Sequence, residues 1–360
     1  MGKPIIVGIS GGVDSSVTAL LLQQQGYDVE CVFMKNWEGN DDENCTSEED
    51  YKDALAVCDH LNLPLRSVNF SKEYWDGVFQ YFIDEYAKGR TPNPDVLCNR
   101  EVKFKAFLDY SLELGAEKIA TGHYAKINES NGKFRLLKGH DPGKDQSYFL
   151  YLLGQNALSQ SIFPIGGIDK KDVRKLAQDS GLINHAKKDS TGVCFIGEQN
   201  FFKDFLKKYI PAKPGKIKTI NDQVCGEHDG LMYYTMGQRK GLGIGGGHGD
   251  KEAPWFVAEK DMKTNTIIVA QGHDHPALFH NHLSANQIHW VGGSPPDDFQ
   301  GLCAKIRYRQ ADQKCKIIEL SSDSCSVIFQ QPQFAITPGQ SIVFYLGDEC
   351  IGGAIIDSRN

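Results

Sequence analysis

Residues 8–16 read Gly-Ile-Ser-Gly-Gly-Val-Asp-Ser-Ser and lie between the apolar run Ile5-Ile6-Val7 and a helical pattern that continues to Leu22. This order predicts a strand, a tight glycine turn and the N-terminus of a helix. The N–H groups of a first helical turn and the positive end of the helix dipole face such a turn, and glycine lets an anion approach the backbone. We therefore expect residues 8–15, the phosphate loop, to bind phosphate, although a glycine turn that only packs tightly would have the same composition.

The loop is not a Walker A motif, because no Gly-Lys pair in the chain is followed by Ser or Thr. Strands and helices alternate around it: we expect strands at Val29–Met34, Pro64–Val68 and Ile119–Gly122, with helices that end at Gly26, begin near Thr46 and span about Lys72–Lys88. A hairpin turn is expected at Asn131-Gly132. This alternation predicts an α/β fold with a doubly wound, mostly parallel sheet. Ligands of such sheets lie over the carboxyl ends of the strands, where Ser10, Met34 and Gly122 fall.

The second half of the chain has a different character. Residues 201–250 hold eight Lys or Arg against five acids, with Pro211 and Pro214 in a linker, and the glycine-rich run 241–246 is interpreted as a loop. Short β-rich runs then indicate a small β-barrel, at Cys303–Tyr308, Lys316–Leu320, Ser326–Phe329 and Ser341–Tyr345. We expect a catalytic domain at residues 1–205, a small basic middle domain at 206–280 and a β-barrel domain at 281–360.

Bulk properties narrow the function only slightly. The formal net charge of -7 argues against indiscriminate nucleic-acid binding, so an RNA partner would need local basic patches. The chain enters its first strand almost at once and has no apolar run near the ~18 residues that span a bilayer, so we expect a cytoplasmic protein. No two of the ten cysteines are closer than ten positions, which excludes Cys-x-x-Cys metal pairs.

Two cysteines lie in distinctive surroundings. Cys98 ends the run Thr91-Pro-Asn-Pro-Asp-Val-Leu-Cys, where we expect an extended approach to a helix over about Asn99–Leu114. A helix N-terminus favours a thiolate. Cys194 lies in a short apolar run between glycines, after Lys187 and Lys188. Taken alone, each is at least as well explained as a buried core residue.

Six sequence motifs, which follow one another along the chain, favour a functional interpretation of both cysteines. They are Gly-Ile-Ser-Gly-Gly-Val-Asp-Ser, Asn-Pro-Asp-Val-Leu-Cys-Asn, Thr-Gly-His-Tyr-Ala, Gly-Lys-Asp-Gln-Ser-Tyr-Phe-Leu, Gly-Val-Cys-Phe-Ile-Gly and Tyr-Thr-Met-Gly-Gln-Arg. The first resembles the pyrophosphate loop of the ATP pyrophosphatases. Together they resemble the bacterial tRNA-specific 2-thiouridylase family along nearly the whole chain. The resemblance implies an adenine nucleotide alpha hydrolase-like fold and thiolation of C2 of the wobble uridine in tRNAs for Lys, Glu and Gln.

The resemblance also implies site residues. ATP would be held by Gly8, Ile9, Ser10, Gly11, Gly12, Val13, Asp14, Ser15, Met34 and Gly122, with Asp14 helping to place Mg²⁺. Cys194 would carry sulfur as a persulfide from a cysteine desulfurase or a sulfur-relay protein. Cys98 would release that sulfur and leave a transient Cys98–Cys194 disulfide, and Asp95 would act as acid or base. The residues expected to contact tRNA are Asn93, Pro94, Asp95, His123, Lys144, Asp145, Gln146, Arg307, Tyr308 and Gln340.

Simpler interpretations exist for some of these residues. A histidine beside a hairpin is often only a surface residue, and Arg307 and Tyr308 on one strand would ordinarily form a solvated edge. Two other functions also remain open. One is another pyrophosphate-loop ligase, of the argininosuccinate, NAD or GMP synthetase type, which needs no paired reactive cysteines. The other is an ATP- and RNA-binding protein without chemistry.

Overall fold

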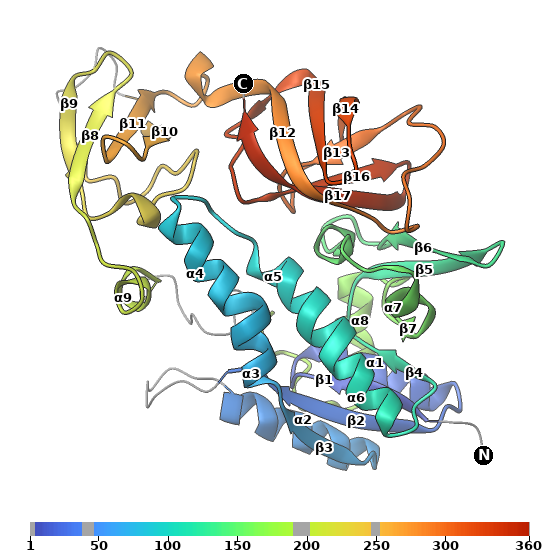
Figure 1. Ribbon diagram of the computed structural model, residues 1–360. Helices are drawn as coiled ribbons and strands as arrows, with labels where there is room; N and C mark the ends of the chain where they lie inside the picture. Colours follow the sequence, from blue (N-terminus) through green and yellow to red (C-terminus); the bar gives the residue numbers. More distant parts are fainter. Residues whose placement is uncertain (1–3, 38–46, 190–201, 246–252, 360) are drawn as a thin grey trace.

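The N-terminal part of the chain folds around a parallel sheet (Figure 1). The structure is a computed structural model that describes residues 4–37, 47–189, 202–245 and 253–359. Five strands pair in the order β3-β2-β1-β4-β7, and every pairing is parallel. The strands are β1 (Ile5–Ile9), β2 (Val29–Lys35), β3 (Leu65–Asn69), β4 (Lys118–Ala120) and β7 (Ser161–Ile162). The strand order reverses beside β1, so the phosphate loop follows the strand at the topological switch point.

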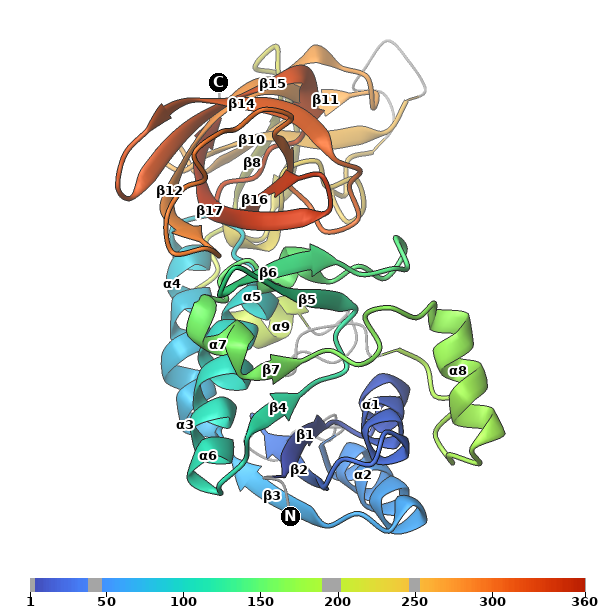
Figure 2. The same cartoon turned by 90° about the vertical axis from the view of Figure 1, so that its right-hand side faces the viewer.

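Helices cover both faces of this sheet (Figure 2). On one face lie α1 (Val13–Gln24), α2 (Ser47–Leu61) and α8 (Lys170–Asp179), and on the other lie two long helices, residues 71–87 and 94–113. The side chains of β1 alternate between the two cores: Val7 and Ile9 pack with the first set, and Ile6 packs with the second. The predicted doubly wound α/β fold is therefore confirmed.

The helix that carries Cys98 begins earlier than the sequence indicated. Its segments are α5 (Pro94–Leu97), the π-helical η2 (Cys98–Ala106) and α6 (Phe107–Glu113), so the expected start at Asn99 is wrong. Pro94 suits a first helical position, where its missing N–H is not needed and its φ is already helical. Cys98 lies one turn inside the helix, and since the dipole effect fades within the first turn, the helix-terminus argument for its thiolate no longer applies.

The other long helix is also continuous, with segments α3 (Ser71–Tyr74), the π-helical η1 (Trp75–Phe79) and α4 (Gln80–Ala87). After β4 the chain forms the hairpin of β5 (Ala125–Ser130) and β6 (Lys133–Lys138), with Asn131 and Gly132 at positive φ in the turn, as predicted. Short helices follow at η3 (Ser147–Leu150) and α7 (Gln155–Ser159).

The middle of the chain forms a separate four-stranded sheet. Helix α9 (Phe202–Lys207) leads into strands paired in the order β10-β11-β8-β9, with bounds β8 (Gly215–Thr219), β9 (Val224–His228), β10 (Trp255–Asp261) and β11 (Thr266–Gln271). The short helix η5 (Leu231–Tyr233) follows β9. Residues 241–245 form turn and coil, as expected for a loop, and Gly246 lies outside the described residues.

The C-terminal part closes into a six-stranded barrel after the short helix η6 (Pro276–Leu278). The strands follow the order β12-β15-β14-β13-β16-β17, and β12 pairs with β17 to close the ring. Their bounds are β12 (Phe279–Trp290), β13 (Cys303–Lys305), β14 (Gln313–Leu320), β15 (Ser324–Phe334), β16 (Ser341–Leu346) and β17 (Glu349–Arg359). The predicted barrel is confirmed, but the expected strand to Tyr308 is not: β13 ends at Lys305, and Arg307 and Tyr308 lie in the turn that follows.

The barrel and the catalytic domain share one sheet. Strand β6 pairs with β17 through Glu349 opposite Leu137 and Cys350 opposite Leu136, which adds the β5–β6 hairpin to the barrel strands. The two domains are thus joined by main-chain hydrogen bonds as well as by side-chain packing. Among the described residues, no helix has the length and apolar composition needed to cross a membrane.

Candidate active site

The phosphate loop is folded back onto the first turn of α1. The Ser10 N–H donates to Ser15 Oγ at 3.1 Å, and Ser15 Oγ donates to the Gly12 carbonyl at 3.1 Å. Gly11 has φ 73°, and a Cβ there would lie 2.2 Å from the Asp50 carbonyl oxygen, so only glycine fits. Gly12 caps α1 without a side-chain hydrogen bond, which leaves the N–H groups of the first turn without a side-chain cap. This arrangement fits a phosphate ligand.

Met34 and Gly122 lie beside the loop at the same edge of the sheet. The Met34 Cε would be 3.1 Å from a Cβ on Gly8, and a Cβ on Gly122 would be 2.8 Å from the Ser15 backbone nitrogen. Their expected position at the carboxyl ends of β2 and β4 is confirmed. Contact between these residues and adenosine stays a prediction.

A group of ionised side chains surrounds Asp14. Lys170 Nζ lies 2.7 and 2.8 Å from the two Asp14 carboxylate oxygens, and the Tyr124 hydroxyl donates to the same carboxylate at 2.7 Å. Lys170 Nζ also lies 2.7 Å from Asp189. Two further cations reach Asp189, Lys144 at 2.7 Å and Arg174 at 2.8 Å. We call these six residues the charged cluster: Asp14, Tyr124, Lys144, Lys170, Arg174 and Asp189.

The charged cluster has three cations against two carboxylates, an excess of one positive charge beside the phosphate loop. Burial alone would raise the pKa of Asp189, but hydrogen bonds from Lys144 and Lys170 outweigh it and hold the pKa at about 2. Burial and the Asp14 charge raise the pKa of Tyr124, so its hydroxyl stays a neutral donor. Lys170 is therefore fixed beside the phosphate loop, and Lys144 and Arg174 lie one ion pair further away.

Magnesium does not fit Asp14 in this arrangement. An ion ligated by Asp14 would lie next to the Lys170 ammonium, which contacts both carboxylate oxygens, and the like charges would repel. Within the described ranges, no group of three or more His, Cys, Asp or Glu could hold a metal ion. We derive no step through magnesium, and Asp14 as a Mg²⁺ ligand stays a prediction that requires Lys170 to move.

The helix that carries Asp95 and Cys98 meets the phosphate loop through Gly122 and His123. The His123 ring lies 5.6 Å from the Phe104 ring of η2, and Gly122 packs against the loop. Asp95 and Cys98 are three residues apart on the helix and share a face. The phosphate loop and the helix that carries Cys98 are therefore neighbours in the fold, and their joint action as one site stays a prediction.

Asp95 is exposed to solvent yet has protein atoms on most sides. This crowding raises the pKa of Asp95 by desolvation, and the nearby Lys103 charge opposes the rise. Cys98 itself is 5% exposed and packs in the main core.

His123 is buried rather than on the surface. Its Nδ1 lies 2.8 Å from Thr121 Oγ1, and its ring packs between Phe104 and Phe163. Burial, followed by the Lys103 charge, holds the pKa of His123 well below its usual range, so the ring is neutral. Stacking of His123 on a nucleotide stays a prediction.

The other predicted tRNA contacts lie near the barrel. The Asn93 side chain lies near the Tyr148 hydroxyl. Asp145 is buried, and its carboxylate accepts from the backbone N–H groups of Gly139 and Ser147. Gln146 Oε1 accepts from the Tyr124 N–H. Asp145 and Gln146 hold their own turn in place, and contact between this turn and tRNA stays a prediction.

Arg307 and Tyr308 are likewise engaged within the protein. Arg307 donates to the Ala335 carbonyl at 2.9 Å, and the Tyr308 hydroxyl donates to the Lys144 carbonyl at 3.2 Å. The turn after β13 therefore contacts the turn that carries Lys144. Cys194 lies outside the described residues, so the structure does not bear on its pairing with Cys98.

Family models match the chain in three consecutive parts. The matching models are a tRNA methyl transferase HUP domain at residues 3–198, a tRNA methyl transferase PRC-barrel domain at 203–271 and an aminomethyltransferase beta-barrel domain at 280–356. Together with the parallel sheet and its phosphate loop, these matches place the chain in the class of HUP-domain proteins that carry two additional β domains.

Full-length relatives define the family more closely. The chain is 59% identical to the tRNA-specific 2-thiouridylase MnmA of Hydrogenovibrio crunogenus over 99% of this chain and 94% of that protein. It is 59% identical to the protein of that name in Nitrosomonas eutropha over 98% of each chain, and 57% identical to that of Salmonella arizonae over 99% of this chain and 97% of that protein. The chain belongs to the tRNA-specific 2-thiouridylase family, and the resemblance drawn from the six motifs is confirmed.

Proposed function

We propose that this protein is a tRNA-uridine 2-sulfurtransferase that uses ATP to adenylate the C2 oxygen of a wobble uridine and then replaces that oxygen with sulfur. One observation carries the proposal: in a chain that matches 2-thiouridylases along its length, the phosphate loop contacts Gly122, and the adjacent His123 packs on the helix of Asp95 and Cys98. These contacts support the proposal because they place the candidate nucleotide loop next to the helix of the candidate thiol.

The chemistry needs both halves of this site. The C2 carbonyl of uridine is urea-like and a poor electrophile, so its oxygen must first become a good leaving group. Transfer of AMP from ATP to that oxygen does this and releases pyrophosphate. The phosphate loop would hold the pyrophosphate portion at the N-terminus of α1, and the excess charge of the charged cluster would offset the charge that develops there.

Sulfur transfer would follow with Cys194 as the carrier. The terminal sulfur of a Cys194 persulfide, supplied by a cysteine desulfurase or a relay protein, attacks C2. Cys98 thiolate then attacks Cys194 Sγ, which breaks the sulfur–sulfur bond, leaves sulfur on C2 as AMP departs, and forms a Cys98–Cys194 disulfide. An external thiol must reduce this disulfide before the next turnover. Asp95, one turn from Cys98, is the candidate group for proton transfer.

The target base must leave the anticodon stack to reach this site. Asn93, Pro94 and Asp95 begin the Cys98 helix and are the candidate residues to receive it. We propose the tRNAs for Lys, Glu and Gln as substrates.

Nucleoside mass spectrometry tests the function directly. Unmodified transcripts of these tRNAs, incubated with the protein, ATP, Mg²⁺, cysteine and a cysteine desulfurase as the source of persulfide sulfur, should yield 2-thiouridine, and omission of ATP should abolish it. Pyrophosphate release on a small-molecule substrate without any tRNA would instead favour another pyrophosphate-loop ligase. Binding of both ATP and tRNA without pyrophosphate release would favour a protein without chemistry.

Asp95→Asn should slow thiolation and stabilise the fold at pH 7. The raised pKa of Asp95 means that the folded state favours the protonated carboxyl, so its stabilising contribution is present at low pH and is lost as pH rises through the raised pKa. Asparagine never ionises, so the variant avoids that loss. Thermal unfolding across pH 3–8 should show a higher Tm for the variant at pH 7 and a difference that shrinks toward pH 3; a lower Tm at pH 7 would contradict the assigned shift.

Replacing Lys207 and Lys208 together with Ala should weaken tRNA binding and reduce its salt dependence. Both lysines are exposed at the end of α9, and for every phosphate that the variant no longer binds, the log–log salt slope should fall by about 0.7–0.9. Pyrophosphate release at saturating tRNA should persist. Lys72→Ala is a matched control, because Lys72 is also an exposed lysine ion-paired on its own helix. Equal affinity and slope in the double variant would exclude this helix as a tRNA contact.

A further inference from the structure

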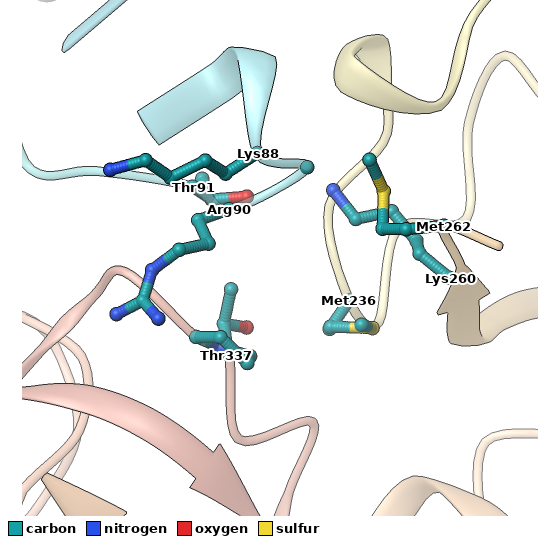
Figure 3. A pocket seen from close by; sticks show the side chains of 9 residues that line it. Lys88, Arg90, Thr91, Met236, Lys260, Met262 and Thr337 are labelled. Atoms are coloured by element: carbon teal, nitrogen blue, oxygen red, sulfur yellow. The ribbon is translucent and has the colours of Figure 1, made fainter. Parts of the chain in front are cut away.

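A three-way junction lies directly before the Cys98 helix. A pocket of about 140 Å³ is lined by Arg90 and Thr91 from the catalytic domain, Met236 and Lys260 from the middle domain, and Thr337 from the barrel (Figure 3). Arg90, Thr91 and Thr337 lie together on one side of this pocket. The segment that connects α4 to α5 is therefore held where all three domains meet.

The barrel forms hydrogen bonds with the backbone of this segment. The Thr91 N–H donates to the Pro338 carbonyl at 3.0 Å. The Gln340 side-chain amide donates to the Thr91 carbonyl at 2.8 Å and to the Pro92 carbonyl at 3.2 Å. Gly339 allows this approach, since its φ is 92° and a Cβ there would lie 2.9 Å from the Thr91 nitrogen. We call these contacts of Pro338, Gly339 and Gln340 with Thr91 and Pro92 the clamp.

Arg90 ties the same segment to the last barrel strand. Its guanidinium lies 2.7 Å from Glu85 at the end of α4 and 2.8 Å from Asp357 of β17, and it also donates to the Ile356 carbonyl at 2.9 Å. Glu85 is buried, so this ion pair is shielded from solvent on the helix side. The clamp therefore holds a segment that is already fixed at its preceding residue.

The clamp lies immediately before the Cys98 helix in the sequence. Only Asn93 separates Pro92 from Pro94, the first residue of α5, and Asp95 follows at once. Each proline fixes its own φ and restricts the residue before it, so this short connection has little freedom to absorb a displacement. The Asn93 side chain lies near the hydroxyl of Tyr148, which donates to the Ser341 carbonyl of the barrel at 2.9 Å. A shift of Thr91 would move Asp95 and the turn that leads to Cys98.

We propose that Gln340 is a positioning residue: its amide holds Thr91 and Pro92 so that the barrel sets the place of Asp95 and Cys98. This proposal rests on the proposed function. Both N–H donors of its amide are used on the protein backbone, so this role is additional to the tRNA contact that the sequence suggested, which stays a prediction for its Oε1.

The test compares Gln340→Glu with Gln331→Ala in the full chain. The glutamate has the same shape but sets a carboxylate against two carbonyls, whereas Gln331 is an exposed barrel residue. For Gln340→Glu we expect thiolation at saturating tRNA to fall by about 10- to 100-fold, since a displacement of about 1 Å costs on that order. The dissociation constant for tRNA and its salt slope should stay near those of the native chain. Gln331→Ala should change none of these quantities.

Alkylation of cysteines gives a readout that does not depend on activity. Mapping of labelled peptides after a short pulse of iodoacetamide should show faster labelling of Cys98 in Gln340→Glu, while Cys350, which is fully buried, stays protected. Faster labelling of both cysteines would indicate general unfolding of Gln340→Glu, and the same result in Gly339→Ala would overturn the proposal. Gly339→Ala, which strains the same contact from its backbone, should reproduce the selective effect and serves if Gln340→Glu does not fold.

Two other outcomes would also overturn the proposal. Weaker tRNA binding with unchanged thiolation at saturating tRNA would make Gln340 a tRNA contact. Unchanged kinetics and unchanged Cys98 labelling would show that the clamp is not needed. If the native chain makes no 2-thiouridine, the proposed function fails, and selective Cys98 labelling then still reports on the clamp alone.

Discussion

Lys170→Met should lower tRNA-dependent pyrophosphate release by about 100- to 1,000-fold, the range found when one preorganised charge-stabilising group is removed from a site. Lys170 is 8% exposed and contacts both Asp14 and Asp189, so its ammonium is fixed beside the phosphate loop. Methionine keeps much of the side-chain volume but leaves the Asp14 carboxylate facing the triphosphate without its cation. Release of labelled pyrophosphate from ATP at saturating tRNA measures the effect.

Lys171→Met is the matched control for this variant. Lys171 is the next residue of α8, but its side chain is 79% exposed and its nearest acid is Asp169 at 3.7 Å. We expect its rate to stay within about twofold of the native chain, as is usual for an exposed charge. Equal loss in both variants would mean that α8 has been disturbed as a whole. Native activity in Lys170→Met would show that the charged cluster is not part of the ATP site.

The phosphate loop could be predicted from the sequence because its information is local. An apolar strand, a glycine turn and a helix start are adjacent in the chain, and the closeness of Gly11 to Asp50 only adds a reason for the glycine. The positions of Met34 and Gly122 were predictable for a related reason, because parallel strands place their carboxyl ends at one edge. Four of the six barrel strands, β13, β14, β15 and β16, were predicted from their short β-rich runs, apart from where β13 ends, whereas β12 and β17, which close the ring, were not predicted.

The charged cluster could not be predicted in the same way. Lys170 is 156 positions from Asp14, and a lysine at the start of an exposed-looking helix carries no local sign of its partner. Lys103 was missed for a similar reason: its influence on both Asp95 and His123 depends on how η2 packs against the segment after β4. Tyr124 was part of a quoted motif, but its hydroxyl contact with Asp14 follows only from the folded chain.

The start of the Cys98 helix was mispredicted because two prolines were interpreted as an extended segment. Pro92 does lie in the segment before the helix, but Pro94 occupies the first helical position, where proline is favoured. The clamp explains why the chain can turn into a helix so abruptly: Thr91 is already held by the barrel, in part through a hydrogen bond from Gln340, which is 249 positions away. Such long-range contacts leave no local pattern in the sequence.

Cys194→Ser should reduce 2-thiouridine formation to less than about one thousandth of the native rate, the scale of loss when a covalent catalytic group is removed. Pyrophosphate release should persist in a single turnover, because serine still allows ATP and tRNA to bind but cannot carry the persulfide that displaces AMP from the adenylated base. Cys98→Ser should likewise lose 2-thiouridine formation and keep pyrophosphate release, since it removes the thiolate that would break the sulfur–sulfur bond. Nucleoside mass spectrometry and pyrophosphate release on the same samples measure both.

Cys303→Ser is the control for the two cysteine variants. Among the eight cysteines that the structure describes, Cys303 alone is not buried, so it is the cysteine that a non-specific thiol reagent would reach most easily. Its replacement should leave both reactions intact, because it lies on barrel strand β13 and has no part in the proposed transfer. Thiolation that survives Cys194→Ser would contradict the persulfide route and favour direct attack of free sulfide on the adenylated base. Loss of pyrophosphate release together with thiolation would instead make Cys194 part of the ATP or tRNA site.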